Sequence, residues 1–275
     1  MVTPMAVDRI VAEVLEDVAA REAIVPFKEI KARSRDTAPP RDAAEALLRA
    51  GCGVIAEIRR VVPDKGPVPT ITDEESIAAL ARDFEGAGVH LLACHTGQRR
   101  FRGSPADLRA ARDAVQVPMF CRDIIVDPYQ IHEARCYGAD MIPLQVELLG
   151  QARLESLLDR IESLGMTALA EVRTPAEADR AMAAGVSVVG VNAWPIGGGS
   201  LNVAAFGEIA PGLPESTIRV ALGGVLSPRD LLSYAASGAD AVVVGEGILL
   251  SEEPPARTRG LVAAGQHPAC PSRRR

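Results

Sequence analysis

The strongest constraint on the fold is an alternation that begins at Gly53. Short runs rich in Val, Ile and Leu alternate with amphipathic segments of about 10 to 15 residues, the pattern of repeated βα units in a parallel sheet. The strand candidates are residues 54–58, 89–94, 118–121, 141–146, 168–172, 186–191, 218–222 and 241–244. Eight such units predict a single TIM (β/α)8 barrel, in which the functional groups lie at the carboxyl ends of the strands.

A recurring glycine supports this count of strands. Gly88, Gly138, Gly185 and Gly238 follow one another at intervals of about 50 residues, and each precedes an apolar strand candidate. Glycine commonly ends a helix because it adopts the left-handed backbone conformation without strain. The competing fold, a doubly wound open sheet, needs a glycine-rich turn directly after its first strand, where this chain has Arg59-Arg60-Val61-Val62.

The chain divides into an extension, a barrel and a tail. With 275 residues and 48% hydrophobic content it can form one large core. In the extension we expect helices over residues 5–21 and 41–50, separated by a polar stretch at 31–40. The division is residues 1–50 for the helical extension, 51–265 for the barrel and 266–275 for a flexible, solvated tail.

Charge and cysteine content limit the possible partners. The net charge of −6 and the pI near 5.4 disfavour a nucleic-acid surface and leave a small anionic ligand as the expected partner. Five cysteines without CxxC spacing suit free thiols in a reducing compartment, and no residue cluster has metal-ligand spacing, so we expect no metal. No leader and no apolar run of about 18 residues is present, which predicts a cytoplasmic protein without membrane contact. We expect a monomer or homodimer.

Polar side chains follow most of the predicted strands. Glu57 and Arg59 end the first strand, and this pair has a purely structural alternative, an internal ion pair. Convergence of several such residues on one barrel mouth makes proton transfer and charge stabilisation possible. His95 is either a proton carrier or a hydrogen-bonded wall residue. The other candidates at strand ends are Arg122, Gln145, Glu171, Asn192 and Trp194.

Two pairs of glycines follow the last two strands. Gly223 and Gly224 follow the seventh strand, and Gly245 and Gly247 follow the eighth. In this fold these positions commonly bind phosphate, because small residues let backbone N–H groups approach the anion. Plain turns are the alternative explanation for the same glycines.

Several blocks in order resemble the indole-3-glycerol phosphate synthase family, a family of TIM-barrel lyases of tryptophan biosynthesis. The resemblance runs from about residue 8 to residue 250 and includes the helical extension. The blocks that carry it are Val54-Ile55-Ala56-Glu57-Ile58-Arg59-Arg60, Pro63, Lys65-Gly66, Phe101-Arg102-Gly103-Ser104, Asp107-Leu108, Asp127-Pro128-Tyr129-Gln130-Ile131, Glu133-Ala134-Arg135, Ala170-Glu171-Val172, Gly190-Val191-Asn192 and Val244-Gly245-Glu246.

The resemblance implies a reaction without a cofactor. It is the ring closure and decarboxylation of 1-(2-carboxyphenylamino)-1-deoxyribulose 5-phosphate, or of an analogue, with loss of carbon dioxide and water. Glu57 and Glu171 stand where the family has its catalytic glutamates, Glu171 being the expected general base, and Asn192 matches the family's asparagine. We expect substrate contacts from Arg59, Lys65, His95, Gln145 and Trp194, and catalytic roles for Glu57, Arg122, Glu171 and Asn192.

The chain departs from the family pattern at several positions. Arg122 and Arg59 replace lysines, and arginine holds its proton too tightly to serve well as a general acid. Trp194 replaces an arginine that recognises the substrate carboxylate, and Leu222-Gly223-Gly224 replaces Glu-Ser-Gly. Three interpretations remain open: an enzyme retuned for an analogue, an ordinary synthase with a tolerant site, and a non-catalytic barrel that binds a sugar phosphate or a partner.

Overall fold

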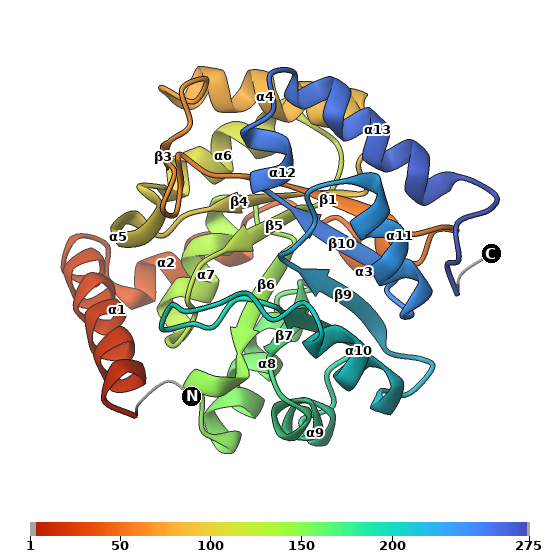
Figure 1. Cartoon of the computed structure of the whole chain (residues 1–275). Helices are drawn as coiled ribbons and strands as arrows, with labels where there is room; N and C mark the ends of the chain where they lie inside the picture. Colours follow the sequence, from red (N-terminus) through yellow and green to blue (C-terminus); the bar gives the residue numbers. More distant parts are fainter. Residues whose placement is uncertain (1–3, 274–275) are drawn as a thin grey trace.

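Eight parallel strands close into a barrel in the order β1-β10-β9-β8-β7-β6-β5-β4 (Figure 1), which confirms the predicted fold class. The computed structural model describes residues 4–273. A short antiparallel hairpin, β2 (Val61–Val62) and β3 (Gly66–Pro67), follows the first strand. The barrel strands are β1 (Gly53–Ile58), β4 (Leu91–His95), β5 (Met119–Arg122), β6 (Met141–Gln145), β7 (Thr167–Val172), β8 (Val188–Asn192), β9 (Ile218–Leu222) and β10 (Ala241–Val244).

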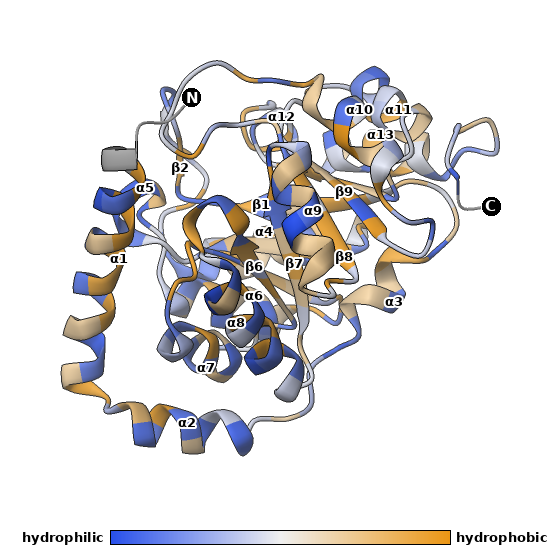
Figure 2. Cartoon of the chain, turned by 90° about the horizontal axis from the view of Figure 1, so that it is seen from below, coloured by the Kyte–Doolittle hydropathy of each residue, from blue (hydrophilic) through white to orange (hydrophobic). Residues whose placement is uncertain are grey.

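Helices surround the barrel, and Figure 2 shows their hydrophilic residues around an interior of hydrophobic strands. Two 3-10 turns, η1 (Val146–Leu148) and η2 (Ala210–Gly212), follow β6 and α10. The helices are α1 (Pro4–Ile24), α2 (Phe27–Arg35), α3 (Ala43–Leu47), α4 (Glu74–Gly86), α5 (Gln98–Phe101), α6 (Pro105–Ala114), α7 (Pro128–Cys136), α8 (Gln151–Ser163), α9 (Pro175–Ala183), α10 (Ala205–Ile209), α11 (Pro228–Ala236), α12 (Glu246–Leu249) and α13 (Pro254–Gln266).

The recurring glycine ends every second barrel helix, as predicted. Gly88, Gly138, Gly185 and Gly238 have φ values of 89°, 93°, 87° and 92°. In each case the N–H of the following residue donates to a carbonyl five residues back in the helix, as Ala139 does to Ala134. This bond closes the helix end and turns the chain into the next strand.

The alternation of side chains along each strand decides which residues reach the barrel interior. Ile55, Phe120 and Leu169 belong to the cluster that fills the barrel. Because side chains alternate with a period of two, the residue two positions further along each strand points the same way. Glu57, Arg122 and Glu171 therefore enter the barrel mouth directly above this apolar layer.

The N-terminal extension differs in detail from the prediction. Helix α2 covers residues 27–35 and so includes part of the stretch that was expected to be non-helical. Its mean hydropathy is low, but Ile30 packs with Val18 and Tyr129, which tie α1 and α2 to α7. Helix α3 is shorter than expected, and its Ala43, Ala46 and Leu47 join the cluster inside the barrel.

The C-terminal tail makes specific contacts at the amino-terminal end of the barrel. Ser272 Oγ donates to the carbonyl of Gly51, and Arg273 donates to both carboxylate oxygens of Asp240 at 2.9 and 2.7 Å. Ser272 and Arg273 thus lack the solvated environment that the sequence suggested, whereas residues 274 and 275 lie outside the described part. Within residues 4–273, no helix combines the length and apolar character that crossing a membrane requires.

Candidate active site

Glu57 and Glu171 lie on opposite sides of the barrel mouth, because β1 and β7 are four positions apart in the closed sheet of eight strands. Arg122, at the end of β5, joins them. Its Nε lies 3.3 Å from Glu57 Oε1, and its Nη1 lies 2.8 Å from Glu171 Oε2. Both glutamates are buried, with 6% and 2% of their surface exposed. One guanidinium therefore holds both predicted catalytic carboxylates in place.

His95 binds the other side of the first glutamate. Its Nε2 lies 2.7 Å from Glu57 Oε1, and its ring packs on Phe101 with centroids 3.8 Å apart. An ionised carboxylate only accepts hydrogen bonds, so Nε2 carries the proton and Nδ1 carries the lone pair. Nδ1 is buried and has no hydrogen-bond partner in the described part of the chain. His95 is thus an oriented imidazole with one free acceptor.

Two further arginines contact the glutamates from their own strands. Arg59 Nη1 lies 3.4 Å from Glu57 Oε2, and Arg173 Nη2 donates to Glu171 Oε1 at 2.7 Å. Each arginine stands two residues after its glutamate, so both point to the same side of the chain. Arg173 is a site residue that the sequence prediction did not select, although its spacing from Glu171 was the signal for it.

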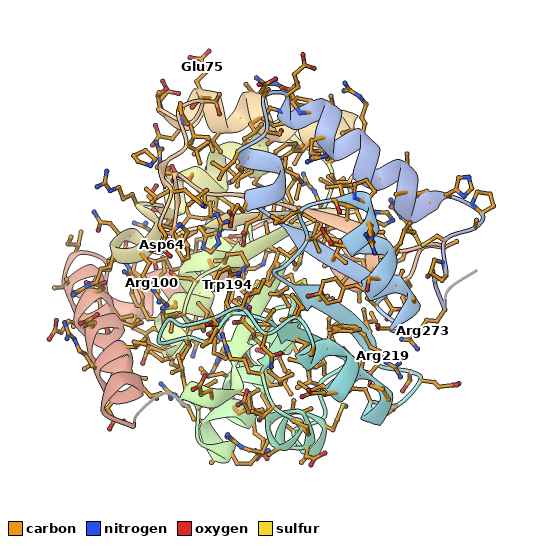
Figure 3. All side chains as sticks on the ribbon, in the orientation of Figure 1. Asp64, Glu75, Arg100, Trp194, Arg219 and Arg273 are labelled. Atoms are coloured by element: carbon orange, nitrogen blue, oxygen red, sulfur yellow. The ribbon has the colours of Figure 1, made fainter. Side chains whose placement is uncertain are left out.

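Asn192 and Trp194 come from the end of β8. Asn192 Nδ2 donates to Glu171 Oε1 at 2.8 Å, while its Oδ1 accepts from the backbone N–H of Trp194 at 2.9 Å. These two bonds fix the orientation of the amide. The Trp194 side chain is 45% exposed and lies in the connection after β8 (Figure 3).

The buried charges shift the pKa values of these groups. Burial by itself would raise the pKa of Glu171, but Arg122, Arg173 and the Asn192 amide outweigh burial and lower it to about 2. The pKa of Glu57 is likewise lowered despite burial, by His95, Arg59 and Arg122. Burial lowers the pKa of His95, Glu57 raises it, and the guanidiniums of Arg122 and Arg59 lower it further, so that the pKa stays below its ordinary value. Both carboxylates are therefore ionised and His95 is neutral near pH 7.

Two predicted substrate contacts have other surroundings. Gln145 accepts from the backbone N–H of Ile125 at 3.3 Å and donates to the carbonyl of Asp123 at 3.0 Å. Its amide thus holds the β5–α7 connection, which favours a positioning role. Lys65 lies in the exposed turn between β2 and β3, so it is not part of the buried cluster.

Close packing accounts for the four glycines after the last strands. A side chain at Gly223 would meet Trp194 Cδ1 at 2.8 Å, and one at Gly245 would meet Glu57 Oε2 at 2.4 Å. Gly224 and Gly247 face Val203 and the Val225 carbonyl in the same way, at 2.8 and 2.6 Å. The glycines thus leave room for neighbouring residues, and phosphate binding at them stays a prediction.

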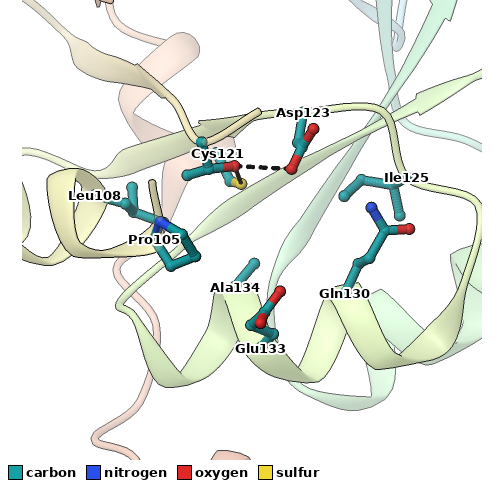
Figure 4. Close-up of a pocket in the computed structure, with 9 residues that line it drawn as sticks. Pro105, Leu108, Cys121, Asp123, Ile125, Gln130, Glu133 and Ala134 are labelled. Carbon is teal, nitrogen blue, oxygen red and sulfur yellow. Dashed lines mark hydrogen bonds between the residues drawn. The ribbon is translucent and has the colours of Figure 1, made fainter. Parts of the chain in front are cut away.

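A small cavity lies on the outer side of the barrel wall rather than at its mouth (Figure 4). Thr96 donates to Asp123 Oδ2 at 3.0 Å beside the Cys121 thiol, and residues of α6 and α7 complete the lining. The space open to the centre of a water molecule is about 10 Å³, enough for about one water. Asp123, although it adjoins Arg122, thus faces away from Glu57 and Glu171.

The sequence matches one family over almost its whole length. The profile of the indole-3-glycerol phosphate synthase family aligns with residues 7–261. The chain belongs to the indole-3-glycerol phosphate synthase family. The indole-3-glycerol phosphate synthase of Saccharopolyspora erythraea is 51% identical over 264 residues, covering 96% of this chain and 97% of that protein. The protein of the same name from Mycobacterium sp. (strain KMS) is 52% identical and covers 96% of both chains.

Solved structures of lower identity share the barrel. N-acetylmannosamine-6-phosphate 2-epimerase from Clostridium perfringens aligns with a TM-score of 0.58 at 16% identity, over 74% of this chain and 90% of that one. Thiamine phosphate pyrophosphorylase from Pyrococcus furiosus aligns with a TM-score of 0.56 at 15% identity, over 77% and 93% of the two chains. At these identities the likeness describes the fold alone.

Membership of the indole-3-glycerol phosphate synthase family leaves the unusual side chains of this chain to be explained. The sequence resemblance implies a lysine where this chain has Arg122, and in the structure Arg122 is bound to two carboxylates at once. A lysine ammonium is a compact charge on a flexible stem, whereas a guanidinium is a planar fork that can hold both glutamates in a fixed arrangement. The burial of Arg122 lowers its pKa, but Glu171 and Glu57 raise it by more, so Arg122 remains charged.

Proposed function

We propose that this chain is a cofactor-free carbon–carbon lyase of the indole-3-glycerol phosphate synthase type. Its substrate would be 1-(2-carboxyphenylamino)-1-deoxyribulose 5-phosphate or a close analogue, and its role would be in cytoplasmic tryptophan biosynthesis, as a monomer or homodimer. The observation that carries the proposal is the pair of inward-facing glutamates, Glu57 and Glu171, bridged by Arg122 at the barrel mouth.

The proposed roles follow from charge and geometry. Ring closure needs positive charge near the carbonyl oxygen that becomes an alkoxide, and Arg122 is the guanidinium between both glutamates. Dehydration needs a base for a proton, and Glu171 is our general base, held by Asn192. Glu57 would orient the substrate with His95. The phosphate would bind through the backbone of Gly223, Gly224, Gly245 and Gly247.

Substrate binding must change the surroundings of Glu171 before it can act as a base. A carboxyl with a pKa of about 2 accepts a proton poorly at neutral pH. Arg122 and Arg173 both contact this carboxylate, so any substrate group that draws a guanidinium away raises its pKa. Arg59, Lys65 and Trp194 remain our candidates for the remaining substrate contacts, and Gln145 is our candidate for positioning the β5–α7 connection.

The test compares turnover by wild type, which has an arginine at position 122, with turnover by R122K, whose lysine can give up its proton. The carboxyphenylamino-deoxyribulose phosphate is added to wild type and to R122K, and indole formation is followed by absorbance and fluorescence. We expect slow turnover by wild type and a kcat that is about 10-fold or more higher in R122K, because a positioned acid contributes about 10²- to 10⁴-fold.

A matched control changes an arginine outside the mouth. Arg153 pairs with Asp127 on the helical layer, 3.2 Å away, and R153K should leave kcat unchanged. Binding of the substrate without turnover in either wild type or R122K would favour a non-catalytic barrel. Absence of calorimetric binding would contradict the proposed function altogether.

A further inference from the structure

Arg173 has one nitrogen that makes no hydrogen bond within residues 4–273. Nη2 donates to Glu171 Oε1 at 2.7 Å, and Nε donates to the Trp194 carbonyl at 2.8 Å. Nη1 is buried and has no hydrogen-bond partner among the described residues, and it forms only a loose ion pair with Glu147 Oε2, 3.7 Å away. The side chain is 13% exposed. Two bonds thus hold the guanidinium while its third nitrogen is left for another acceptor.

An unfilled donor on a buried guanidinium needs an explanation. Leaving such a group without an acceptor lowers stability, and native proteins rarely keep it without a reason. At the same mouth, Arg59 Nε and His95 Nδ1 are also buried and find no hydrogen-bond partner among residues 4–273. Each of these three atoms belongs to a residue that contacts Glu57 or Glu171, so each is available to a ligand at the mouth.

We propose that Arg173 recognises the carboxylate of the substrate through Nη1, while Nη2 continues to hold Glu171. This inference rests on the proposed function, because it assigns one anionic group of that substrate. The guanidinium shares its charge over three nitrogens, so Nη1 can bind a carboxylate oxygen while Nη2 and Nε keep their present partners. Glu171, Arg173 and the substrate carboxylate would then form one connected chain across the mouth.

The position of Arg173 separates the carboxylate from the phosphate. In this fold phosphate binds after the seventh and eighth strands, which here are β9 and β10. β7 is separated from β9 by β8, so Arg173 lies on another part of the rim. Arg59 is on the phosphate side instead, since its Nη2 would lie 3.2 Å from a Cβ at Gly245.

The residue that anchors Arg173 also brings an aromatic surface. Arg173 Nε donates to the Trp194 carbonyl. The Trp194 indole lies against Gly223, and the residue is 45% exposed. An aromatic ring beside a carboxylate-binding arginine suits a benzoate group, whose ring can stack while its carboxylate is bound. The ligand class that this part of the mouth fits is therefore an aminobenzoate-type group.

The test compares two unreactive probes in which the substrate ketone is reduced to an alcohol. One keeps the ortho carboxylate on its phenyl ring and the other has hydrogen there. Calorimetric dissociation constants are measured for wild type, R173Q, R173K, E147Q and the surface control R153Q. Wild type should prefer the carboxylated probe by about 10- to 100-fold, the usual effect of a hydrogen bond to a charged group.

The variants should change this preference and little else. R173Q should bind both probes equally, with an affinity for the probe without carboxylate within about threefold of wild type, and R173K should keep part of the preference. E147Q removes the competing carboxylate and should tighten the binding of the carboxylated probe about threefold. R153Q should behave as wild type.

The outcomes separate this inference from the proposed function. If R173Q keeps the preference for the carboxylated probe, or weakens the binding of both probes equally, Arg173 does not recognise the carboxylate. The proposed function would still stand. If wild type binds both probes equally, the inference is also wrong. If wild type binds neither probe, the proposed function fails, and the assignment of Arg173 fails with it.

Discussion

The two ends of the barrel hold buried carboxylates in different ways. At the amino-terminal end, Asp140 accepts from the backbone N–H groups of Met119 and Arg41, both at 2.7 Å, and Asp240 accepts from that of Arg219 at 2.8 Å. At the carboxyl-terminal end, the bonds recorded for Glu57 and Glu171 come from side chains.

This difference has a physical consequence. A backbone N–H at the start of a strand cannot leave its place without breaking the sheet, so Asp140 and Asp240 are fixed. Each of these aspartates also pairs with an arginine, Arg112 and Arg273 respectively. Side-chain partners can exchange for a ligand, so Glu57 and Glu171 can be rearranged when a substrate enters. The amino-terminal end thus serves stability and the carboxyl-terminal end serves chemistry, as expected for this fold.

The largest test of this contrast is E171Q. Glutamine keeps the size of the side chain but cannot take the proton, so kcat for the proposed reaction should fall about 10²- to 10⁴-fold. The measurement is indole formation at saturating substrate. An E171Q enzyme with a wild-type kcat would exclude Glu171 as the base.

The matching change at the other end is D240A. It leaves Arg273 without its carboxylate and a backbone N–H without its acceptor, and the free energy of unfolding should fall by about 3 to 5 kcal/mol. Urea unfolding measures this loss, while kcat of the folded protein should stay at the wild-type value. A large loss of kcat without loss of stability would contradict the division between the two ends.

Acid should show that Glu171 also contributes to stability, with a smaller effect than the two changes described above. Its pKa is depressed to about 2 in the folded state, so its stabilisation is present above the ordinary carboxyl pKa and is lost as pH falls toward 2. Between about pH 5 and pH 2 wild type should lose about 3 kcal/mol more unfolding free energy than E171Q.

Urea unfolding at several pH values measures this difference, because the other carboxyls are present in both proteins and cancel. Parallel pH profiles for wild type and E171Q would show that Glu171 is not held by the arginines in solution.

Much of this molecule follows from local sequence. The alternation of apolar and amphipathic segments determines eight βα units, and the recurring glycines determine where helices stop. The period of two along each strand determines that Glu57 and Arg59 share a face, and likewise Glu171 and Arg173. The candidate site could be predicted to that extent because each of these signals spans only a few neighbouring residues.

Only the tertiary structure decided which of these side chains meet. Arg122 bridges strands on opposite sides of the barrel, and His95 reaches Glu57 from the neighbouring strand. The Gln145 amide bonds to backbone groups, and Lys65 lies on an exposed hairpin. Helix α2 is held in place because Ile30 packs with Val18 and Tyr129. Such contacts depend on how eight strands are staggered when the sheet closes, and that stagger is set by packing between residues far apart in the chain, which no local pattern encodes.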